Sequence, residues 1–432
     1  MKEEISICWL RRDLRLEDNV SLFEALKSSD KVLLVFIFDT TILNKLEDKA
    51  DRRVAFIHES LVSLNQTIKK YGSSLWVVHN SPLAAFQELN NQFDVKAIFT
   101  NRDYEPGAIE RDKLIKEFAY ANKIAFKTYK DQVIFEKSEI TKRDGTPYTV
   151  FTPYANAWKQ QLTKQTEVSY PSEMMLSKLY QRDNLPFPTL NEIGFQDIPS
   201  GVGENPEIDT DFLTHYHETR NFPAVDSTSK LGVHLRFGTI SIRKLVKAAR
   251  DINDTWLNEL IWREFFMMIL YHFPEVEHRA FRKKYDAIRW RNNEDEFQLW
   301  CKGETGYPLV DAGMRQLNAS GWMHNRVRMI VASFLTKHLL IDWRWGEAYF
   351  AGKLLDYELS SNNGNWQWAA GCGCDAAPYF RVFNPGLQAK KFDPDQVYIR
   401  RWIADYDTNY PPAMIDHEFA RKRALTVYKE SL

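Results

Sequence analysis

The sequence has 432 residues, of which 27% are charged and 44% hydrophobic, and its formal net charge is −1. This balance is typical of a folded globular protein, and it excludes both a disordered chain and a uniformly basic nucleic-acid-binding chain. Four cysteines are too few for a secreted disulfide scaffold, and no apolar run approaches the about 18 residues that a transmembrane helix needs. We therefore expect a cytoplasmic protein without a signal peptide or a membrane partner.

Short apolar runs alternate with helical patterns in the first part of the chain. We predict strands at residues 5–10, 32–38, 75–78, 97–99 and 124–126. Between the second and third runs, residues 52–70 keep apolar side chains at helical spacing. This alternation predicts an α/β domain with a doubly wound parallel sheet at residues 1–130. No G-x-G-x-x-G motif follows the first strand, so the fingerprint of a nicotinamide dinucleotide site is absent.

Prolines interrupt a polar segment at residues 131–206, which we predict to be an inter-domain connector. Helical patterns dominate after it. They cover residues 242–252, 256–271, 294–300, 308–317, 324–339 and 345–357. We therefore predict an all-α C-terminal domain at residues 207–432, and ten of the 13 tryptophans lie in this domain.

An aromatic stripe runs along the predicted helix that begins near Trp256. Trp256, Glu259 and Trp262 are spaced to share one helical face, an arrangement that is most often part of a core. Two more segments, residues 321–329 and 356–368, add amides, guanidinium groups and further indoles to the same domain. Together these side chains predict a pocket for a flat heteroaromatic ligand with charged appendages.

Two weaker patterns lie nearby. Residues 228–232 offer hydroxyl and backbone N–H groups before a helical pattern, which suits a phosphate but is equally an ordinary N-cap. His215 and His217 form an H-x-H pair, but no cysteine or carboxylate framework accompanies them, so we predict no metal site. A serine nucleophile elbow and a P-loop are both absent.

Longer motifs carry a family resemblance. They are WLNELIWREFF at residues 256–266, GYPLVDAGMRQLNASGWMHNRVRM at 306–329, DWR at 342–344, NNGNWQW at 362–368 and DAAPYFRVFNP at 375–385. These motifs resemble the flavin-binding domain of the DNA photolyase and cryptochrome family, and CWLRRDLRL at residues 8–16 is similar to that family's opening strand and loop. The resemblance is strongest to class I cyclobutane pyrimidine dimer photolyases. It implies an α/β antenna domain, a connector and a helical domain that encloses FAD.

The resemblance assigns a set of positions to the cofactor. They are Tyr216, Thr228, Ser229, Lys230, Leu231, Gly232, Trp256, Arg328, Asp356, Tyr357, Glu358 and Asn362. Asn362 matches the position that faces flavin N5, where a neutral amide favours the reduced anionic flavin. Arg328 and Asp356 match an ion pair beside the flavin ring, and a purely structural salt bridge is compatible with that role.

Three tryptophans, Trp366, Trp343 and Trp290, match the family's electron relay from the flavin to the surface. Core packing is the alternative interpretation of these indoles. An indole can be oxidised to a radical, so a spaced series of tryptophans permits stepwise reduction of the flavin under light.

Further positions match the contacts to damaged DNA. Glu259 matches the carboxyl that hydrogen-bonds the pyrimidine dimer, and Trp262 and Trp368 match the indoles that hold its bases. Asn325 and Met329 stand where enzymes specific for the (6-4) photoproduct carry histidines, so a (6-4) mechanism is not expected. Arg220 and Arg326 are expected to contact the flanking phosphates.

The resemblance therefore implies a monomeric lyase that repairs a dimer flipped out of UV-damaged DNA, by light-driven electron transfer from reduced FAD. A signalling cryptochrome with the same FAD and tryptophans is the alternative, and its long C-terminal extension is not expected after Leu432. A flavin oxidoreductase would need a nicotinamide site. The antenna chromophore stays open, because Gly107 and Ala108 replace the asparagine and glutamate of folate-binding members, which leaves a deazaflavin, another flavin or none.

Overall fold

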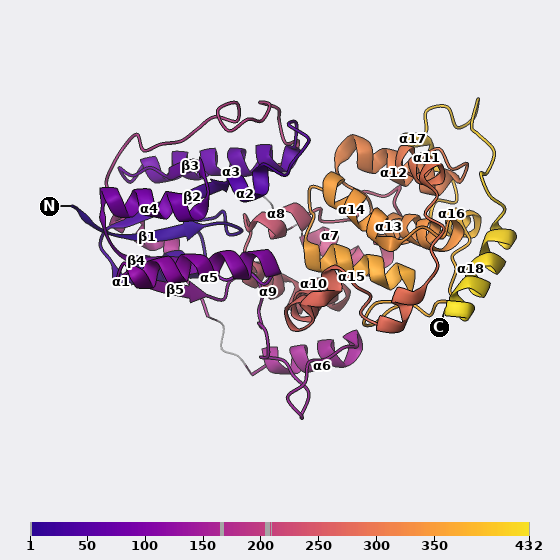
Figure 1. The fold of residues 1–432 in the computed structure, drawn as a ribbon, viewed down its shortest axis with the longest axis horizontal. Helices are drawn as coiled ribbons and strands as arrows, with labels where there is room; N and C mark the ends of the chain where they lie inside the picture. The colour runs from indigo at the N-terminus through magenta and orange to yellow at the C-terminus, as the bar shows by residue number, and fades with distance from the viewer. Residues whose placement is uncertain (1, 165–167, 204–207, 209, 432) are drawn as a thin grey trace. The chain divides into compact units, whose positions relative to one another are not determined.

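The computed structural model describes residues 2–164, 168–203, 208 and 210–431. The chain divides into two compact units (Figure 1). The first unit comprises Met1–Glu136, Lys164–Ile208 and Leu231–Lys247, and the second comprises Lys137–Thr163, Asp209–Lys230 and Ala248–Leu432. Residues 131–206, which we predicted to be a connector, thus contribute to both units.

The first unit is built on a parallel sheet. Its strands are β1 (Glu4–Leu10), β2 (Val32–Asp39), β3 (Trp76–Asn80), β4 (Asp94–Asn101) and β5 (Ala125–Tyr129). The strand order is β3-β2-β1-β4-β5, and each neighbouring pair is parallel. The prediction of a doubly wound parallel sheet is therefore confirmed, and the largely apolar composition of β1 and β2 is explained by burial on both faces.

Helices connect these strands. They are α1 (Val20–Ser28), α2 (Thr40–Leu43), α3 (Arg52–Lys69), α4 (Pro82–Gln92) and α5 (Pro106–Ala121), with a 3-10 turn, η1 (Ser172–Lys178), and the short helix α8 (Gly232–Phe237) later in the chain. The core of the unit forms where β1 meets α4, and the Trp9 and Phe86 rings pack edge to face at 5.1 Å. Helix α9 (Ile242–Ile252) begins in this unit and ends in the second.

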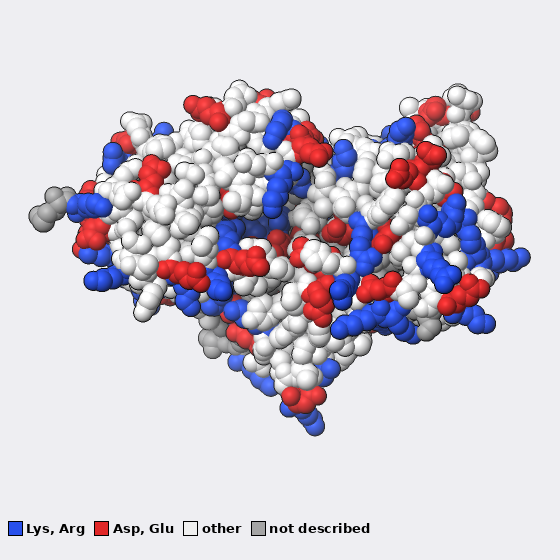
Figure 2. All heavy atoms as spheres, viewed as in Figure 1, with Lys and Arg blue, Asp and Glu red and all other residues white. Residues whose placement is uncertain are grey.

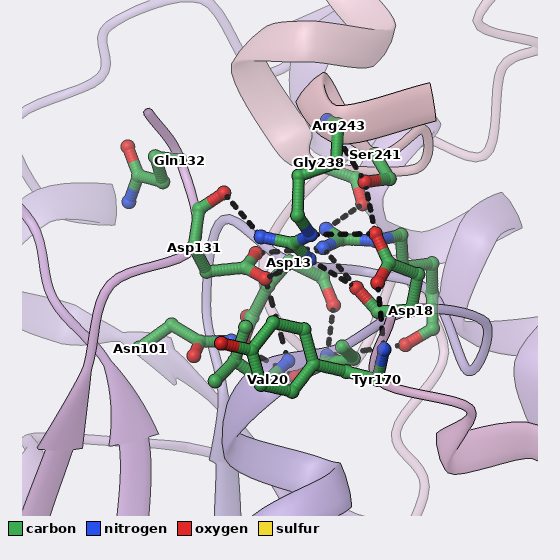
Figure 3. A network of polar contacts seen from close by, with 12 residues as sticks. Asp13, Asp18, Val20, Asn101, Asp131, Gln132, Tyr170, Gly238, Ser241 and Arg243 are labelled. Atoms are coloured by element: carbon green, nitrogen blue, oxygen red, sulfur yellow. Dashed lines mark hydrogen bonds and ion pairs between the residues drawn. The ribbon is translucent and has the colours of Figure 1, made fainter. Parts of the chain in front are cut away.

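A buried ionic network holds residues 231–247 within the first unit (Figure 3). Asp131, which is 1% exposed, accepts hydrogen bonds from Arg15 at 2.7 Å and Arg243 at 2.9 Å. Arg243 also donates to Asp18 at 2.7 Å. Burial alone would raise the pKa of Asp131, but the charges of Arg15 and Arg243 hold it below its ordinary value. The carboxylate therefore joins the loop after β1 to the start of α9.

Removal of this carboxylate should destabilise the protein strongly. We expect Asp131→Ala to lower the free energy of unfolding by about 3 kcal/mol, because two largely buried guanidinium groups lose their shared partner. Asp30→Ala is the matched control, since Asp30 pairs with Lys178 at 3.0 Å in an exposed position and should change stability by less than about 1 kcal/mol. Urea unfolding measures both, and equal losses would contradict the assignment.

The second unit is helical. Its helices are α6 (Phe151–Leu162), α7 (Thr210–Thr219), α10 (Asp254–His272), α11 (Glu294–Lys302), α12 (Pro308–Ser320), α13 (Asn325–Ser333), α14 (Trp343–Lys353), α15 (Leu359–Ala370), α16 (Pro385–Phe392), α17 (Val397–Trp402) and α18 (His417–Ser431). Two 3-10 turns, η2 (Pro274–Glu277) and η3 (Lys283–Ala287), follow α10. In the part of the chain that the structure describes, no helix is both long and apolar enough to cross a membrane.

The prediction of helical structure over residues 324–339 is confirmed, but the second half of this segment is π-helical rather than α-helical. Helix α13 ends at Ser333, and a π-helical turn, η4 (Phe334–His338), follows it. Lys337 lies in this turn, is 1% exposed and donates from Nζ to the Ala370 carbonyl at 2.8 Å. The buried lysine in this wider turn caps the end of α15. Local helical periodicity does not reveal such a contact between distant parts of the chain.

Candidate functional site

A pocket lies between α13, α14 and α15 of the second unit. It contains about 590 Å³ of space not filled by protein atoms, part of which is open to solvent. Nine residues assigned from the sequence line it: Asn325, Arg328, Met329, Asp356, Tyr357, Glu358, Asn362, Trp366 and Trp368. The lining residues that sequence reasoning missed are Ala332, Phe350, Leu354, Ser361 and Asn365. Ser361 and Asn365 lie on α15 beside Asn362, and their closeness to Asn362 in the sequence could have identified them as pocket residues.

Two glycines allow α15 to approach its neighbours closely. A Cβ atom on Gly346 of α14 would lie 2.1 Å from the Trp366 ring. A Cβ atom on Gly364 of α15 would lie 2.2 Å from the Phe266 ring of α10. Because neither site has room for a side chain, α14, α15 and α10 pack at a separation that only glycine permits.

Asn362 is oriented by Glu347, a residue that sequence reasoning missed. The Asn362 Nδ2 group donates to the Glu347 backbone carbonyl at 3.1 Å and to Glu347 Oε1 at 2.7 Å. Burial raises the pKa of Glu347, while the hydrogen bond from Asn362 partly opposes that rise. Because Glu347 engages the amide nitrogen, Asn362 offers its side-chain oxygen to the pocket as a hydrogen-bond acceptor.

Two ion pairs border the pocket. Arg328 donates to both carboxylate oxygens of Asp356, at 3.2 and 2.9 Å, and its Nε also donates to the Met323 carbonyl at 2.7 Å. Arg263 contacts the buried Glu358 at 3.3 Å. The fixed guanidinium of Arg328 thus presents a positive charge and a planar set of donors beside the apolar lining.

Glu259 and Arg220, two residues predicted to act on DNA, form an ion pair. Burial raises the pKa of Glu259 above its ordinary value, and the charge and hydrogen bond of Arg220 oppose that rise. The guanidinium of Arg220 also lies over the Tyr216 ring at 5.5 Å. Both arginine contacts are within the second unit, so Arg220 is already engaged before any DNA arrives.

Arg326 lies near the edge of the pocket. Its guanidinium donates to Asn221 Oδ1 at 2.6 Å and to Met329 Sδ at 3.6 Å, and it lies 4.5 Å from the Phe392 ring centroid. Burial lowers the pKa of Arg326, and the nearby positive charge of Arg220 adds to that shift. The two arginines predicted to hold phosphate therefore influence one another electrostatically.

Trp262 is stacked on an aromatic side chain that sequence reasoning did not connect with it. The Phe151 ring lies parallel to the Trp262 indole, with centroids 3.6 Å apart and an interplanar angle of 4°. Phe151 begins α6, and its backbone N–H donates to Asp375 Oδ2 at 3.0 Å. On the same helix as Trp262, Trp256 is 3% exposed and packs as core.

The three relay candidates share one hydrophobic core in the second unit. Trp366 and Trp343 are each 2% exposed, whereas Trp290 is partly exposed and packs against the same core. The Trp290 ring meets the Tyr428 ring edge to face at 6.0 Å, and Arg344 lies 4.9 Å from the Trp343 ring centroid. Trp366 lines the pocket and Trp290 is partly exposed to solvent, and an electron relay between them stays a prediction.

The predicted phosphate segment is divided between the two units. Thr228, Ser229 and Lys230 belong to the second unit, and Leu231 and Gly232 belong to the first. Lys230 has φ 52° and pairs with Asp226 at 2.8 Å, while no side chain caps the start of α8. These contacts define the local conformation of the segment and leave its role in phosphate binding a prediction.

Among the residues that the structure describes, no group of three or more His, Cys, Asp or Glu is placed to hold a metal ion. His215 and His217 each lie near the Glu218 carboxylate, at 3.5 and 3.6 Å.

The donor set of the pocket fits a flavin. Phe350, Leu354 and Trp366 supply apolar and aromatic surface, and Asn362 and Arg328 supply an acceptor and a cation at its edges. Such a combination suits a flat ring system with polar edges. The sequence prediction rested on amides, guanidinium groups and indoles, and the structure places Asn362, Arg328 and Trp366 around one cavity.

Comparisons with known proteins agree with this chemistry. A family model described as DNA photolyase matches residues 6–172, and one described as the FAD binding domain of DNA photolyase matches residues 256–408. The chain is 38% identical to the deoxyribodipyrimidine photo-lyase of Synechococcus sp., over 95% of this chain and 90% of that protein. Among solved structures, a class III photolyase from Agrobacterium tumefaciens matches with a TM-score of 0.88 and 33% identity, covering 100% of this chain and 98% of that one.

An archaeal photolyase from Sulfolobus tokodaii, solved with two FAD molecules, matches with a TM-score of 0.85 and 34% identity, covering 99% of this chain and 100% of that one. The fold and the pocket together define a protein with an FAD-binding domain. The chain belongs to the DNA photolyase and cryptochrome family. The predictions of the family, of the fold class, of FAD and of a photo-lyase enzyme are confirmed at this level.

The close approach of α14 to α15 can be tested with two alanine substitutions in one helix. We expect Gly346→Ala to lower the free energy of unfolding by about 1–3 kcal/mol and to reduce FAD content, because its new methyl group must displace the Trp366 ring. Gly352→Ala is the control, because no atom lies within 4 Å of its Cβ position. It should be neutral or stabilise α14 by about 0.5–1 kcal/mol. Urea unfolding and flavin absorbance measure the two effects.

Proposed function

We propose that this protein repairs cyclobutane pyrimidine dimers in UV-damaged DNA in a light-dependent reaction. One observation carries the proposal: a single pocket is lined both by residues expected to contact the flavin and by residues expected to contact the dimer. Asn362 and Arg328 belong to the first set, and Asn325, Met329 and Trp368 belong to the second. Relatives named deoxyribodipyrimidine photo-lyase, similar over nearly the whole chain, support the same activity.

When bound, reduced FAD supplies the electron that light transfers to the dimer. The residues of the pocket bind and orient the two partners. Arg328, held by Asp356, offers a fixed positive charge, and Asn362 offers an acceptor oxygen whose direction is set by Glu347. A pocket that places both partners in contact also excludes water between them, which favours direct transfer over side reactions.

Glu259 has the environment that its proposed role requires. We infer that a phosphate of the bound DNA takes Arg220 away from Glu259, since a guanidinium binds phosphate strongly and in a fixed geometry. Without Arg220, the burial of Glu259 acts alone and favours the neutral acid. The protonated carboxyl then donates a hydrogen bond to a carbonyl of the dimer and stabilises the charge that develops there.

The identity of the lesion is supported by two other side chains of the pocket. Neither the amide of Asn325 nor the thioether of Met329 can act as a general acid near neutral pH. Ring opening of a cyclobutane dimer returns the electron and needs no net proton transfer, whereas the (6-4) mechanism depends on histidines at these positions. The pocket therefore favours the cyclobutane dimer.

The proposal is tested directly by a repair assay. FAD-loaded protein is reduced without oxygen and mixed with oligothymidine that carries cyclobutane dimers, and the recovery of thymine absorbance is followed under blue light and in darkness. We expect recovery only under light. Absence of recovery in the fully reduced protein would overturn the proposal and favour a blue-light sensor that uses the same flavin and tryptophans without repair.

The state of Glu259 predicts a pH dependence. Because the acid form donates the hydrogen bond, the repair rate should fall as the pH rises through the elevated pKa of Glu259. Glu259→Gln donates at every pH, so its rate should lose this dependence, whereas Glu259→Ala should lower the rate by about tenfold, which corresponds to about 1.4 kcal/mol. Repair rates measured from acid to alkaline pH check this, and an unchanged profile in Glu259→Gln would exclude the role.

A further inference from the structure

A basic surface surrounds the partly exposed end of the proposed tryptophan relay. Residues 278–291 contain six Lys or Arg and one Asp, in a chain whose formal net charge is only −1. Lys283, Lys284 and Arg289 are exposed side chains in this segment, and we call these three the basic rim. Trp290 directly follows Arg289 in the chain.

The charges of the basic rim are not neutralised by neighbouring acids. The single acid of the segment, Asp286, pairs with Arg344 at 3.0 Å, and Glu296 pairs with Arg291 at 2.7 Å. Within the described parts of the chain, the side chains of Lys283, Lys284 and Arg289 form no ion pair or hydrogen bond. Lys284 lies 5.6 Å from the Tyr285 ring centroid, which holds it on the surface without cancelling its charge.

Trp290 also packs against α18. Its ring contacts the ring of Tyr428 in that helix at 6.0 Å, and Lys337 Nζ lies 3.7 Å from the centroid of the same tyrosine. Burial lowers the pKa of Lys337 to about 7, so the positive field at Trp290 comes from the basic rim rather than from this side chain. The 3-10 turn η3, which carries two residues of the rim, packs against α18. Figure 2 shows Lys and Arg side chains gathered around the position that α18 occupies in Figure 1.

A positive field at the exit of an electron relay selects the charge of the electron donor. Exposed charges act over about 8–10 Å at physiological ionic strength, and they raise the local concentration of oppositely charged solutes. The same field disfavours a positive charge on Trp290 and so makes the oxidised indole easier to reduce. Both effects accelerate reduction by an anion.

We propose that the basic rim recruits a small anionic one-electron reductant to Trp290, an inference that rests on the tryptophan relay predicted from the sequence. The relay leaves the Trp290 indole one electron short. One electron passes from the anion to the indole, which returns to its neutral form, and the reductant is oxidised by one electron. Any proton that the reductant loses enters solvent, and no bond of the protein forms or breaks.

The first test measures anion access without flavin chemistry. Trp290 fluorescence, taken as the difference between the parent protein and Trp290→Phe, is quenched with iodide and separately with neutral acrylamide. We expect the triple variant Lys283→Glu, Lys284→Glu and Arg289→Glu to lower the iodide quenching constant about threefold at low ionic strength. Acrylamide quenching should not change, and the iodide difference should disappear near about 1 M salt.

A matched variant controls for total charge. Lys70→Glu, Lys113→Glu and Lys116→Glu alter three exposed lysines of the first unit and change the net charge by the same amount. This control should keep the parent quenching constant for iodide. Equal losses in both triple variants would show that net charge alone acts, and would overturn the proposal.

The second test measures reduction of the indole itself. After a light flash on the FAD-loaded protein, the absorbance of the oxidised tryptophan is followed with ferrocyanide or with neutral ferrocenemethanol as the donor. Reversal of the basic rim should slow recovery with ferrocyanide about threefold to tenfold at low salt and leave recovery with ferrocenemethanol unchanged.

The possible outcomes distinguish a failure of anion recruitment from a failure of the tryptophan relay itself. Absence of an oxidised-tryptophan signal in the parent protein would remove the relay itself. If the parent protein shows a normal oxidised-tryptophan signal and reversal of the basic rim leaves its recovery with ferrocyanide unchanged, only the recruitment of an anion is overturned. If rim reversal instead weakens binding of undamaged DNA and leaves quenching and recovery unchanged, the surface binds nucleic acid phosphate and the proposal is wrong.

Discussion

The close packing of α15 against α14 and α10 is the constraint on which the pocket depends. Glycine at positions 346 and 364 removes the two side chains that would hold these helices apart. Their approach turns Trp366 and Asn362 toward the same cavity and brings Glu347 of α14 within hydrogen-bond distance of the Asn362 amide. The orientation of the Asn362 amide, the position of the Trp366 ring and the shape of the cavity thus depend on the same close packing of helices.

Charge has different consequences in three environments of this protein. Asp131 is enclosed with two guanidinium groups and acts as a structural link, because removal of the anion leaves buried cations. Glu259 and Arg220 form a partly exposed pair, and under the proposed function a phosphate would separate them, so the same kind of contact would become exchangeable. Lys283, Lys284 and Arg289 are exposed and have no ion-pair partner among the described residues, and in the proposal above they act only through their field. Exposure and the number of partners decide which role each charge takes.

The sequence predicts the sheet and most helices because apolar periodicity reports burial directly. The strands β1 and β2 consist mostly of apolar residues, and α10 carries the predicted aromatic stripe. Helix α6 was missed within the predicted connector, although Phe151, Tyr154, Ala155 and Trp158 have helical spacing and are buried. The surrounding prolines and polar residues obscured that short pattern.

The candidate site was predicted only in part, and this prediction came from sequence motifs rather than from apolar periodicity. The motifs predict residues that contact a ligand, and nine of these residues line one pocket. They do not identify residues that orient those contacts, because Glu347 and Phe151 act through tertiary neighbours far away in the chain. The π-helical turn at Phe334–His338 was missed for the same reason, because its buried Lys337 hydrogen-bonds the end of α15 and not a residue nearby in the sequence.

If Trp262 holds a base of the lesion, as the proposed function requires, the stack of Phe151 on Trp262 has a consequence for the energetics of that contact. An indole held flat against another ring has already lost its rotational freedom when the protein folds. A base that meets this indole therefore does not have to immobilise it, and the entropic cost of ordering the side chain is absent from the binding step. Because Phe151 covers one indole face and the Phe266 ring lies 5.4 Å away at an interplanar angle of 29°, such a base would find the orientation of the indole already fixed by the fold.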